Sequence, residues 1–377
     1  MWSSQKLQFL YFGRLDDEKW FASIVQMLQY FLRQQKKLPF VITIFGAGKY
    51  EQVIKRLSHK DKNIHYFGFQ PLEIIKQHAK QSDYILMPSL FLETFGLSAL
   101  NALSRGMPVI GYKKWWLESF VLDDYDITQF SGSSDKQLIS MIEQILLGDL
   151  HYTKNKKAVL GIAEQYNFDE RFTRFQGIFG GPKKILLVTD FVQKLWGIET
   201  YVHDIAEELR LYGYTVRIVG SEWWQTRGSR LWSMVLSLCN VSFALRLRSI
   251  VQRFKPDVIW YHSVLRYVGW LPLATAGRRA KSYVMLHDLW YIHPYPHRVY
   301  EESDIPSSIG LFAFVCSARS HNPLVWIAVA TKWLMVRLLR KQFVRMKSIL
   351  VPSTFMQSLL SPWTTNSIKT LPHFIQK

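Results

Sequence analysis

A carboxylate, a set of backbone N–H groups and an amide follow one another closely between residues 93 and 101. Glu93 comes just before a predicted helix, which Gly96 opens and which carries leucines at helical spacing. The backbone N–H groups of Phe95, Gly96 and Leu97 begin that helix, which is a favourable place for a phosphate group. Asn101 lies eight residues after Glu93. That spacing is about 12 Å along a helix, roughly the length of a diphosphate with a sugar at each end.

Strands and helices in alternation must position these groups. A short apolar run of buried-strand type, Tyr84–Met87, precedes the motif, and Gly106 ends its helix before the strand that starts at Pro108. Upstream, strands are predicted at Leu7–Phe12, Phe40–Phe45 and Ile64–Phe67, each followed by a helix. This alternation is typical of a parallel sheet with helices on both faces. The Gly46-Ala-Gly48 turn is interpreted as a tight strand-to-helix turn that needs no ligand.

The stretch Glu93-Thr-Phe-Gly, with Asn101-Ala and Gly106-Met-Pro-Val, resembles the donor-binding signature of family 4 retaining glycosyltransferases of the GT-B fold. In that family the first acid contacts the transferred sugar, and a second Glu, eight positions later, holds the nucleotide ribose. This sequence keeps the first acid as Glu93 and has Asn101 in the second place. The other interpretation is an ordinary strand–helix unit with a chance glutamate.

Two cations near the N-terminus extend the resemblance. In the resembled family, a strand ends in Gly-Arg-Leu, a Lys follows, and both cations bind the donor diphosphate. Arg14 and Lys19 match that pattern, although the usual Gly after the Lys is Trp20 here. In a generic helix Lys19 would simply be solvated, so the diphosphate role is what the resemblance implies.

The second half of the chain begins a new α/β alternation. After Gly180-Gly-Pro, a buried strand leads to a loop that contains Gly197. The corresponding loop of the resembled family approaches the donor phosphates or the acceptor. A later strand ends at His287, where that family has a histidine facing the transferred sugar. A lone histidine is more often structural, but this one ends a strand in a loop rich in Trp and His.

Length and the strand–helix alternation predict two Rossmann-like domains, and the resemblance implies that they are of GT-B type. The expected domains are residues 1–179, for the nucleotide sugar, and residues 180–377, for the acceptor. This order is inverted relative to the family. Two explanations remain open: a circular permutant, which a chain of one transferase's length favours, or a slice of two tandem transferases.

The net positive charge is concentrated in the second half of the chain. The chain carries a net charge of +18, with 22 Lys and Arg against 18 Asp and Glu in residues 1–180, and 25 against 11 in residues 181–377. No zinc spacing, RNA-binding aromatic signature or basic tail supports nucleic acid as the partner. The basic and aromatic stretch around residues 324–350 predicts an anionic membrane surface, with a core helix that has one solvated basic face as the alternative.

The interpretation is a retaining, metal-independent glycosyltransferase with no cofactor, which moves a sugar from a nucleotide-diphosphate sugar to a glycan or lipid-linked acceptor. Arg14, Lys19, Glu93 and the backbone at Phe95–Leu97 would hold the donor, and His287 would position the sugar. The pair Asp124 and Asp126 has metal-site spacing but is interpreted as a solvated loop. The two cysteines have neither metal-ligand nor disulfide spacing, and the sequence shows no export signal and no apolar stretch long enough to span a membrane. These observations predict a cytoplasmic protein that is peripheral on the membrane. There are two alternatives. One is a catalytically inactive GT-B scaffold, which the departures from the family pattern at Asn101 and Trp20 favour, and the other is a sugar-nucleotide epimerase.

Overall fold

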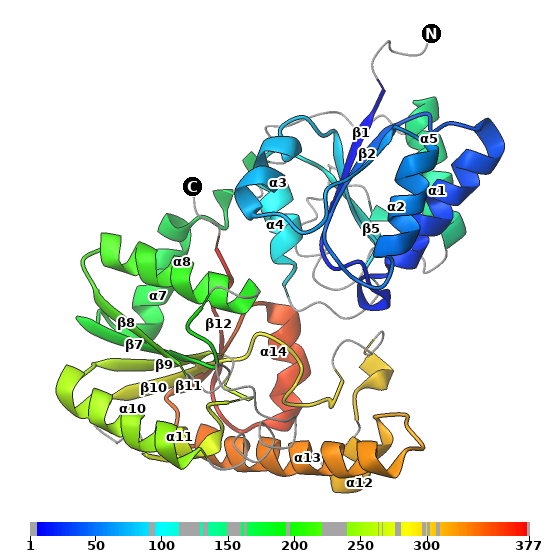
Figure 1. The fold of residues 1–377 in the computed structure, drawn as a ribbon. Helices are drawn as coiled ribbons and strands as arrows, with labels where there is room; N and C mark the ends of the chain where they lie inside the picture. The colour runs from blue at the N-terminus through cyan, green and yellow to red at the C-terminus, as the bar shows by residue number, and fades with distance from the viewer. Residues whose placement is uncertain are drawn as a thin grey trace. The chain divides into compact units, whose positions relative to one another are not determined.

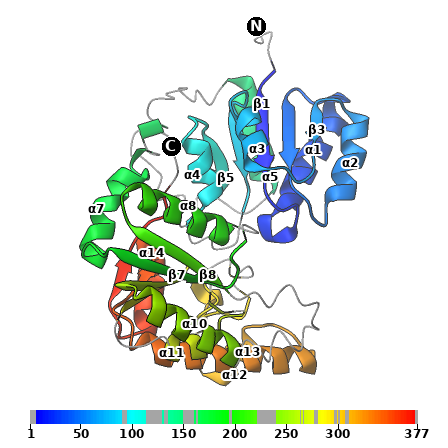
Figure 2. The same ribbon diagram turned by 60° about the vertical axis from the view of Figure 1, so that its left-hand side comes forward.

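The chain folds into two compact units, Met1–Tyr166 and Asn167–Lys377, in the computed structural model (Figures 1 and 2). The structure describes residues 6–89, 95–112, 129–130, 135–148, 160–161, 164–193, 197–220, 240–262, 264–265, 267–275, 280–295, 299, 302–306 and 310–374. Among these residues, no helix is both long enough and apolar enough to cross a bilayer.

The first unit is built on a six-stranded parallel sheet. Its strand order is β3-β2-β1-β4-β5-β6, so the chain moves outward from β1 to β3 and then continues on the other side of β1. The strands are Gln8–Phe12 (β1), Val41–Phe45 (β2), Ile64–Tyr66 (β3), Tyr84–Met87 (β4), Val109–Tyr112 (β5) and Gln129–Phe130 (β6). Strand β4 is buried along its whole length, as expected of an apolar run covered on both faces.

Helices cover both faces of this sheet, with α1, α2 and α5 on one side and α3 and α4 on the other (Figure 1). Helix α1 buries Ile24, Leu28 and Phe31, which recur at helical spacing and form its core-facing stripe. The hydroxyl of Tyr30 donates to Glu143 at 2.8 Å and ties α1 to α5. The helices are Asp17–Lys19 (η1, 3₁₀), Phe21–Gln35 (α1), Glu51–Lys60 (α2), Leu72–Ala79 (α3), Leu97–Leu103 (α4) and Asp135–Leu147 (α5).

The second unit repeats the architecture with a second six-stranded parallel sheet, ordered β12-β11-β10-β9-β7-β8. Its strands are Lys184–Thr189 (β7), Thr215–Gly220 (β8), Val258–His262 (β9), Lys281–Met285 (β10), Ser348–Val351 (β11) and Ile368–Thr370 (β12). Its helices are Phe168–Phe179 (α7), Gly197–Leu211 (α8), Val241–Phe254 (α10), Trp270–Thr275 (α11), Glu302–Asp304 (η5, 3₁₀), Leu311–Cys316 (α12), Pro323–Phe343 (α13), Thr354–Leu360 (α14) and Ser361–Trp363 (η6, 3₁₀).

Helix α7 packs with the second unit, whereas the sequence predicted it to be the last helix of a first domain ending at residue 179. Its phenylalanines share a core with the second sheet: Phe179 lies 4.9 Å from the ring of Trp260 on β9 and 4.6 Å from that of Tyr283 on β10. The compact units therefore divide between Tyr166 and Asn167. The Asn167 side chain caps the helix by accepting from the N–H of Glu170 at 2.9 Å.

The predicted fold class, two α/β domains with parallel sheets, is confirmed. Strand β4 occupies the residues predicted for it, Tyr84–Met87.

Candidate functional site

In the first unit, the two predicted donor-binding groups follow neighbouring strands. Strand β1 pairs with β2 on one side and with β4 on the other, and this is where the chain reverses its direction across the sheet. Ligands of open parallel sheets bind outside the carboxyl ends of the strands at such a reversal. Arg14 and Lys19 follow β1, and Phe95–Leu97 follow β4. The sheet thus directs both groups to the same edge.

The loop after β1 lies directly against the loop after β2. The N–H of Gly13 donates to the carbonyl of Phe45 at 3.1 Å, and the N–H of Leu15 donates to that of Ala47 at 3.0 Å. A Cβ atom on Gly46 would lie 1.8 Å from the carbonyl oxygen of Gly13, so this close approach requires glycine. The glycine turn after β2 therefore supports the neighbouring loop, as a tight structural turn would.

Acidic side chains fix the 3₁₀ helix η1 to the same turn. Asp16 accepts from the N–H of Lys49 at 2.8 Å, while Asp17 accepts from Lys49 Nζ at 2.6 Å and from the hydroxyl of Tyr50 at 2.5 Å. The bond from Lys49 is the main cause that lowers the pKa of Asp17, and the Asp17 bond raises the pKa of Tyr50 to about 12. Because Lys19 is the last residue of η1, these bonds also set its position.

The two predicted cations lie on this supported loop. The carbonyl of Arg14 accepts from the hydroxyl of Tyr11 at 2.7 Å, while its side chain is exposed. Lys19 is half-buried. Trp20 adopts φ 51° and ψ 36°, the left-handed conformation that favours glycine. Tryptophan at this position therefore leaves a glycine-type turn in place.

Helix α4 begins beside the end of β4. Gly96 is its N-cap, with φ 72°, and its carbonyl accepts the first helical bond, from Leu100 at 3.1 Å. The carbonyl of Asn101 accepts from the Ser104 hydroxyl at 2.8 Å and from the guanidinium of Arg105. Burial lowers the pKa of Arg105.

Several residues singled out in the sequence lie outside the described residues, so the structure does not place them. They are Glu93, Asp124 and Asp126.

In the second unit, the corresponding reversal lies between β7 and β9. Asp190, directly after β7, is fully buried, and its Oδ1 accepts from the N–H groups of Tyr267 and Val268 at 2.8 Å each. Gly197 is the first residue of α8, which follows β7 in the chain. His287 lies two residues beyond β10, at the carboxyl end of the same sheet.

His287 is the middle member of a row of three buried histidines, a feature that the sequence did not reveal. His262 Nδ1 lies 3.0 Å from His287 Nε2, and His287 Nδ1 lies 3.4 Å from His373 Nε2. The rings of His287 and His373 are stacked and nearly parallel, with an interplanar angle of 3° and their centroids 5.1 Å apart. The three residues are 0, 7 and 4% exposed. We call them the histidine row.

Burial keeps the histidine row neutral. It is the first cause that lowers the pKa of His287 to about 3 and the pKa values of His262 and His373 well below the ordinary range. A neutral imidazole donates through one nitrogen and accepts through the other. Both nitrogens of His287 therefore face histidine partners, and hydrogen bonding to a sugar would require His287 to exchange one of them.

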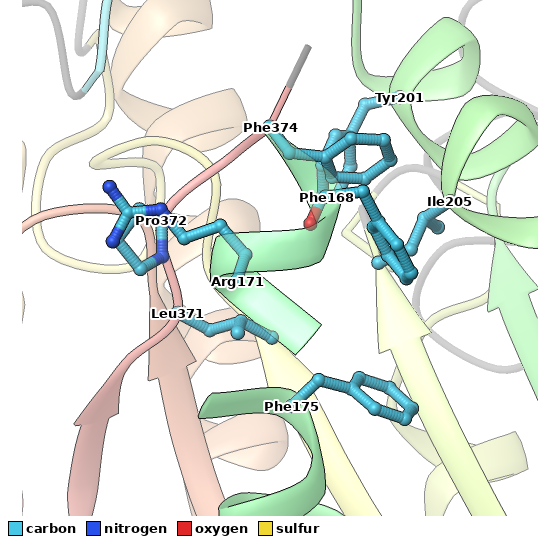
Figure 3. Close-up of a pocket in the computed structure, with 8 residues that line it drawn as sticks. All are labelled: Phe168, Arg171, Phe175, Tyr201, Ile205, Leu371, Pro372 and Phe374. Atoms are coloured by element: carbon cyan, nitrogen blue, oxygen red, sulfur yellow. The ribbon is translucent and has the colours of Figure 1, made fainter. Parts of the chain in front are cut away.

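Tyr201 of α8 packs against the histidine row and also against a closely packed group of aromatic side chains beside α7, which we call the joint. The centroid of its ring lies 4.2 Å from that of His373 and 5.7 Å from that of Phe374. Figure 3 shows Tyr201 beside Phe374. Phe168, at the start of α7, lies 4.9 Å from Phe374. The side chains around this joint leave a cavity of about 10 Å³, at most the room of one water molecule, so it is packed rather than open to a ligand.

Helix α13 orients its cations differently from a simple basic face. Lys332 donates to the carbonyl of Pro294 at 2.6 Å and lies 2.9 Å from the centroid of Trp290, and Arg340 donates to the carbonyl of Tyr291. These two cations are thus turned toward the protein. Arg337, Lys341, Arg345 and Lys347 are exposed.

Comparison with known families gives a match in each part of the chain. Residues 2–159 match the family model described as glycosyl transferases group 1, and residues 196–375 match that of Glycosyltransferase Family 4. A comparison with curated proteins gave no match.

Solved structures give weaker similarity. The pneumococcal O-GlcNAc transferase bound to UDP and GlcNAc is 19% identical, with 47% of this chain and 36% of that chain covered and a TM-score of 0.39. The lipopolysaccharide outer core galactosyltransferase WaaB is 20% identical over 47% and 50%, with a TM-score of 0.39. The catalytic domain of a Helicobacter pylori cholesterol-α-glucosyltransferase is 18% identical over 43% and 99%, with a TM-score of 0.35.

The chain thus spans about a third to a half of the first two proteins. Because these scores are low, the assignment depends on the family models. The group 1 match precedes the Family 4 match, which is the order predicted from the sequence. The chain is therefore similar to a group 1 glycosyltransferase model over its first part and to a Glycosyltransferase Family 4 model over its second part.

Proposed function

We propose that the protein is a retaining glycosyltransferase that takes a sugar from a nucleotide-diphosphate sugar and passes it to a glycan or lipid-linked acceptor. The observation that carries this proposal is the placement of Arg14 and Lys19 after β1, beside β4, at the reversal of the first sheet. Phosphate is a good ligand for such paired cations. The group 1 family match covers the same residues.

In this proposal Arg14 and Lys19 stabilise the negative charge that develops on the leaving diphosphate, so no metal ion is needed. Glu93 contacts the transferred sugar, and the backbone at Phe95–Leu97 faces a phosphate. The departing phosphate takes the proton of the acceptor on the same face of the sugar, which retains its configuration. No side chain is then required as a general base.

A panel of nucleoside diphosphates and their sugars, tested by thermal shift, examines this function. A true ligand at 100 times its dissociation constant is expected to stabilise the fold by about 2.7 kcal/mol. The Lys19→Ala variant should show a smaller shift with the same compound. If no nucleoside diphosphate raises the unfolding midpoint, the proposal fails. Binding without donor hydrolysis or transfer would favour an inactive scaffold, and formation of an epimer would favour an epimerase.

Asn101 provides a second prediction. A carboxylate can accept from both ribose hydroxyls, and hydrogen bonds to a charged partner are roughly twice as strong as neutral ones. Asn101→Glu is therefore expected to bind the nucleoside diphosphate more tightly by about 1–2 kcal/mol, or about 5- to 30-fold. Titration calorimetry measures the difference.

A 2′,3′-dideoxy analogue is the control for Asn101→Glu, since it lacks both hydroxyls and should bind both proteins equally. The new carboxylate would also lie four residues before Arg105, just beyond the end of α4, with which it can pair. A gain that persists with the dideoxy analogue would therefore place residue 101 away from the ribose.

The acceptor side is proposed to rest on an anionic membrane. The most exposed apolar side chains of α12 and the start of α13 are Phe312, Leu324 and Ile327, at 83, 74 and 60%. Exposed cations, Arg337 and Lys341 among them, continue along α13. Each cation near an anionic surface contributes about 1 kcal/mol. Sedimentation with acidic liposomes, but not with neutral ones, is expected, and Phe312→Ser should weaken it. Equal sedimentation with both, or none, rejects this membrane role.

A further inference from the structure

A cavity of about 490 Å³ lies in the second unit, away from the histidine row. Leu286 and Ile349 form its floor, and the end of α13 and the turn at η6 form its walls. Successive residues of a strand point to opposite faces of a sheet. Because Met285 and Leu350 belong to the core cluster under α7 and α8, Leu286 and Ile349 face the other side. The cavity is therefore separate from the strand ends that carry His287.

One wall of this cavity contains the guanidinium of Arg340. It lies 5.6 Å from the centroid of Trp363, which also lines the cavity, and its Nη2 donates to the carbonyl of Tyr291. Its Nη1 is shielded from solvent and has no acceptor among the described residues. Burial lowers the pKa of Arg340 to about 10.

The charge of Arg340 has no counter-charge in the part of the chain that the structure describes. No carboxylate there forms an ion pair with it, and its partners are one neutral carbonyl and one aromatic face. A buried charge is costly unless it is paired. An anion bound in the cavity would supply the missing partner.

The other lining groups suit an anion with an apolar body. Phe343 and Trp363 present aromatic surface, and Ser361, Thr364 and Thr365 also line the cavity. The Ser361 hydroxyl donates to the carbonyl of Ser358 and the Thr364 hydroxyl to the side chain of Asn366, so Arg340 is the main donor for an anion. Arginine is suited to oxyanions because its planar fork can donate two parallel bonds. A cavity with mostly apolar walls and a few polar groups is typical of sites for small organic molecules.

We propose that this cavity binds a small organic oxyanion, a phosphate monoester or a carboxylate, with its charged group at Arg340 and its aromatic or apolar body against Trp363. The site is distinct from the proposed donor site on the first unit. Phosphate and carboxylate share the chemistry that Arg340 recognises, and the probes below distinguish them.

Titration calorimetry on the full chain carrying Arg14→Ala and Lys19→Ala isolates the cavity, because those changes remove the proposed donor-site cations. The probes are phenyl phosphate, benzoate, inorganic phosphate and benzyl alcohol at constant ionic strength. Phenyl phosphate or benzoate is expected to bind at least ~10-fold more tightly than inorganic phosphate or benzyl alcohol, since only the first two combine charge with an aromatic body. Whichever of the two binds more tightly identifies the charged group.

Arg340→Met should weaken binding of the better probe at least ~10-fold. Arg337→Met is the matched control: it removes the same charge from the same helix, but Arg337 is exposed and lies over Trp333, 5.2 Å from its centroid. Equal binding by the Arg340→Met variant and its parent, or no binding by any probe, overturns the proposal. Should Arg340→Met lose its circular dichroism, Arg340→Lys and Trp363→Leu replace it, and unchanged binding in both overturns the proposal equally.

Discussion

Replacing Lys19 with alanine is expected to lower the rate of sugar transfer about 100-fold, which is the scale of losing one preorganised charge contact in the transition state. The bonds of Asp17 and the glycine turn after β2 hold η1 and its last residue, Lys19, in place. A cation fixed in this way needs no rearrangement as charge develops on the diphosphate. Arg14→Ala should have a similar effect.

Lys49→Ala is the matched control for this loss. Lys49 is an exposed lysine on the adjoining turn, and its Nζ pairs with Asp17. The variant keeps the other two bonds that hold η1, from the N–H of residue 49 to Asp16 and from the Tyr50 hydroxyl to Asp17. Since the exposed ion pair that it loses contributes about 1 kcal/mol or less, turnover should stay within a fewfold. The measurement is release of nucleoside diphosphate in the presence of donor and acceptor. Normal turnover by Lys19→Ala would remove Lys19 from the site.

Acidification from pH 7.5 to 5.5 is expected to lower the free energy of unfolding by about 4 kcal/mol through the histidine row. Burial holds the native pKa of all three residues well below the unfolded value of about 6.5. Above pH 6.5 neither state is protonated, so the row adds no pH dependence. Below it the unfolded chain takes up protons that the native row does not, so the free energy of unfolding falls, with about a third of the loss from each histidine.

Urea unfolding at the two pH values measures the effect of the row. His262→Gln should reduce the pH-dependent loss by about a third, since two of the three neutral histidines remain. His321→Gln, an exposed histidine of the same unit, should leave the loss unchanged. An identical loss in His262→Gln and the wild-type protein would show that the row is not what acid disrupts.

Local patterns predicted most of the sheet framework but little of its detail. A continuous apolar run bounded by turn residues located β4, because a strand that is buried on both faces has apolar residues throughout. Helix α7 packs with the second unit, which the sequence could not show, since its phenylalanine stripe indicates that it is buried but not against which sheet. That information depends on tertiary packing.

The same limit applies to the candidate site. Arg14 and Lys19 adjoin a recognisable strand end, whereas the histidine row joins residues that are 25 and 86 positions apart. A sequence signal that could have linked His262 to His287 is that both residues end or follow a predicted strand. Since β9 and β10 pair in the sheet, their two histidines come to lie at the same end of it. For α13, periodicity described a basic helix but could not show that Lys332 and Arg340 turn inward onto backbone carbonyls.

The contact between Phe168 and Phe374 bears on how this chain could have evolved. It places residues from the beginning and the end of the second unit side by side. A domain whose ends are adjacent can be spliced before or after another domain without disturbing its own sheet, and such domains tolerate permutation. The order of the part that matches the group 1 model and the part that matches the Family 4 model is therefore only weakly constrained by folding.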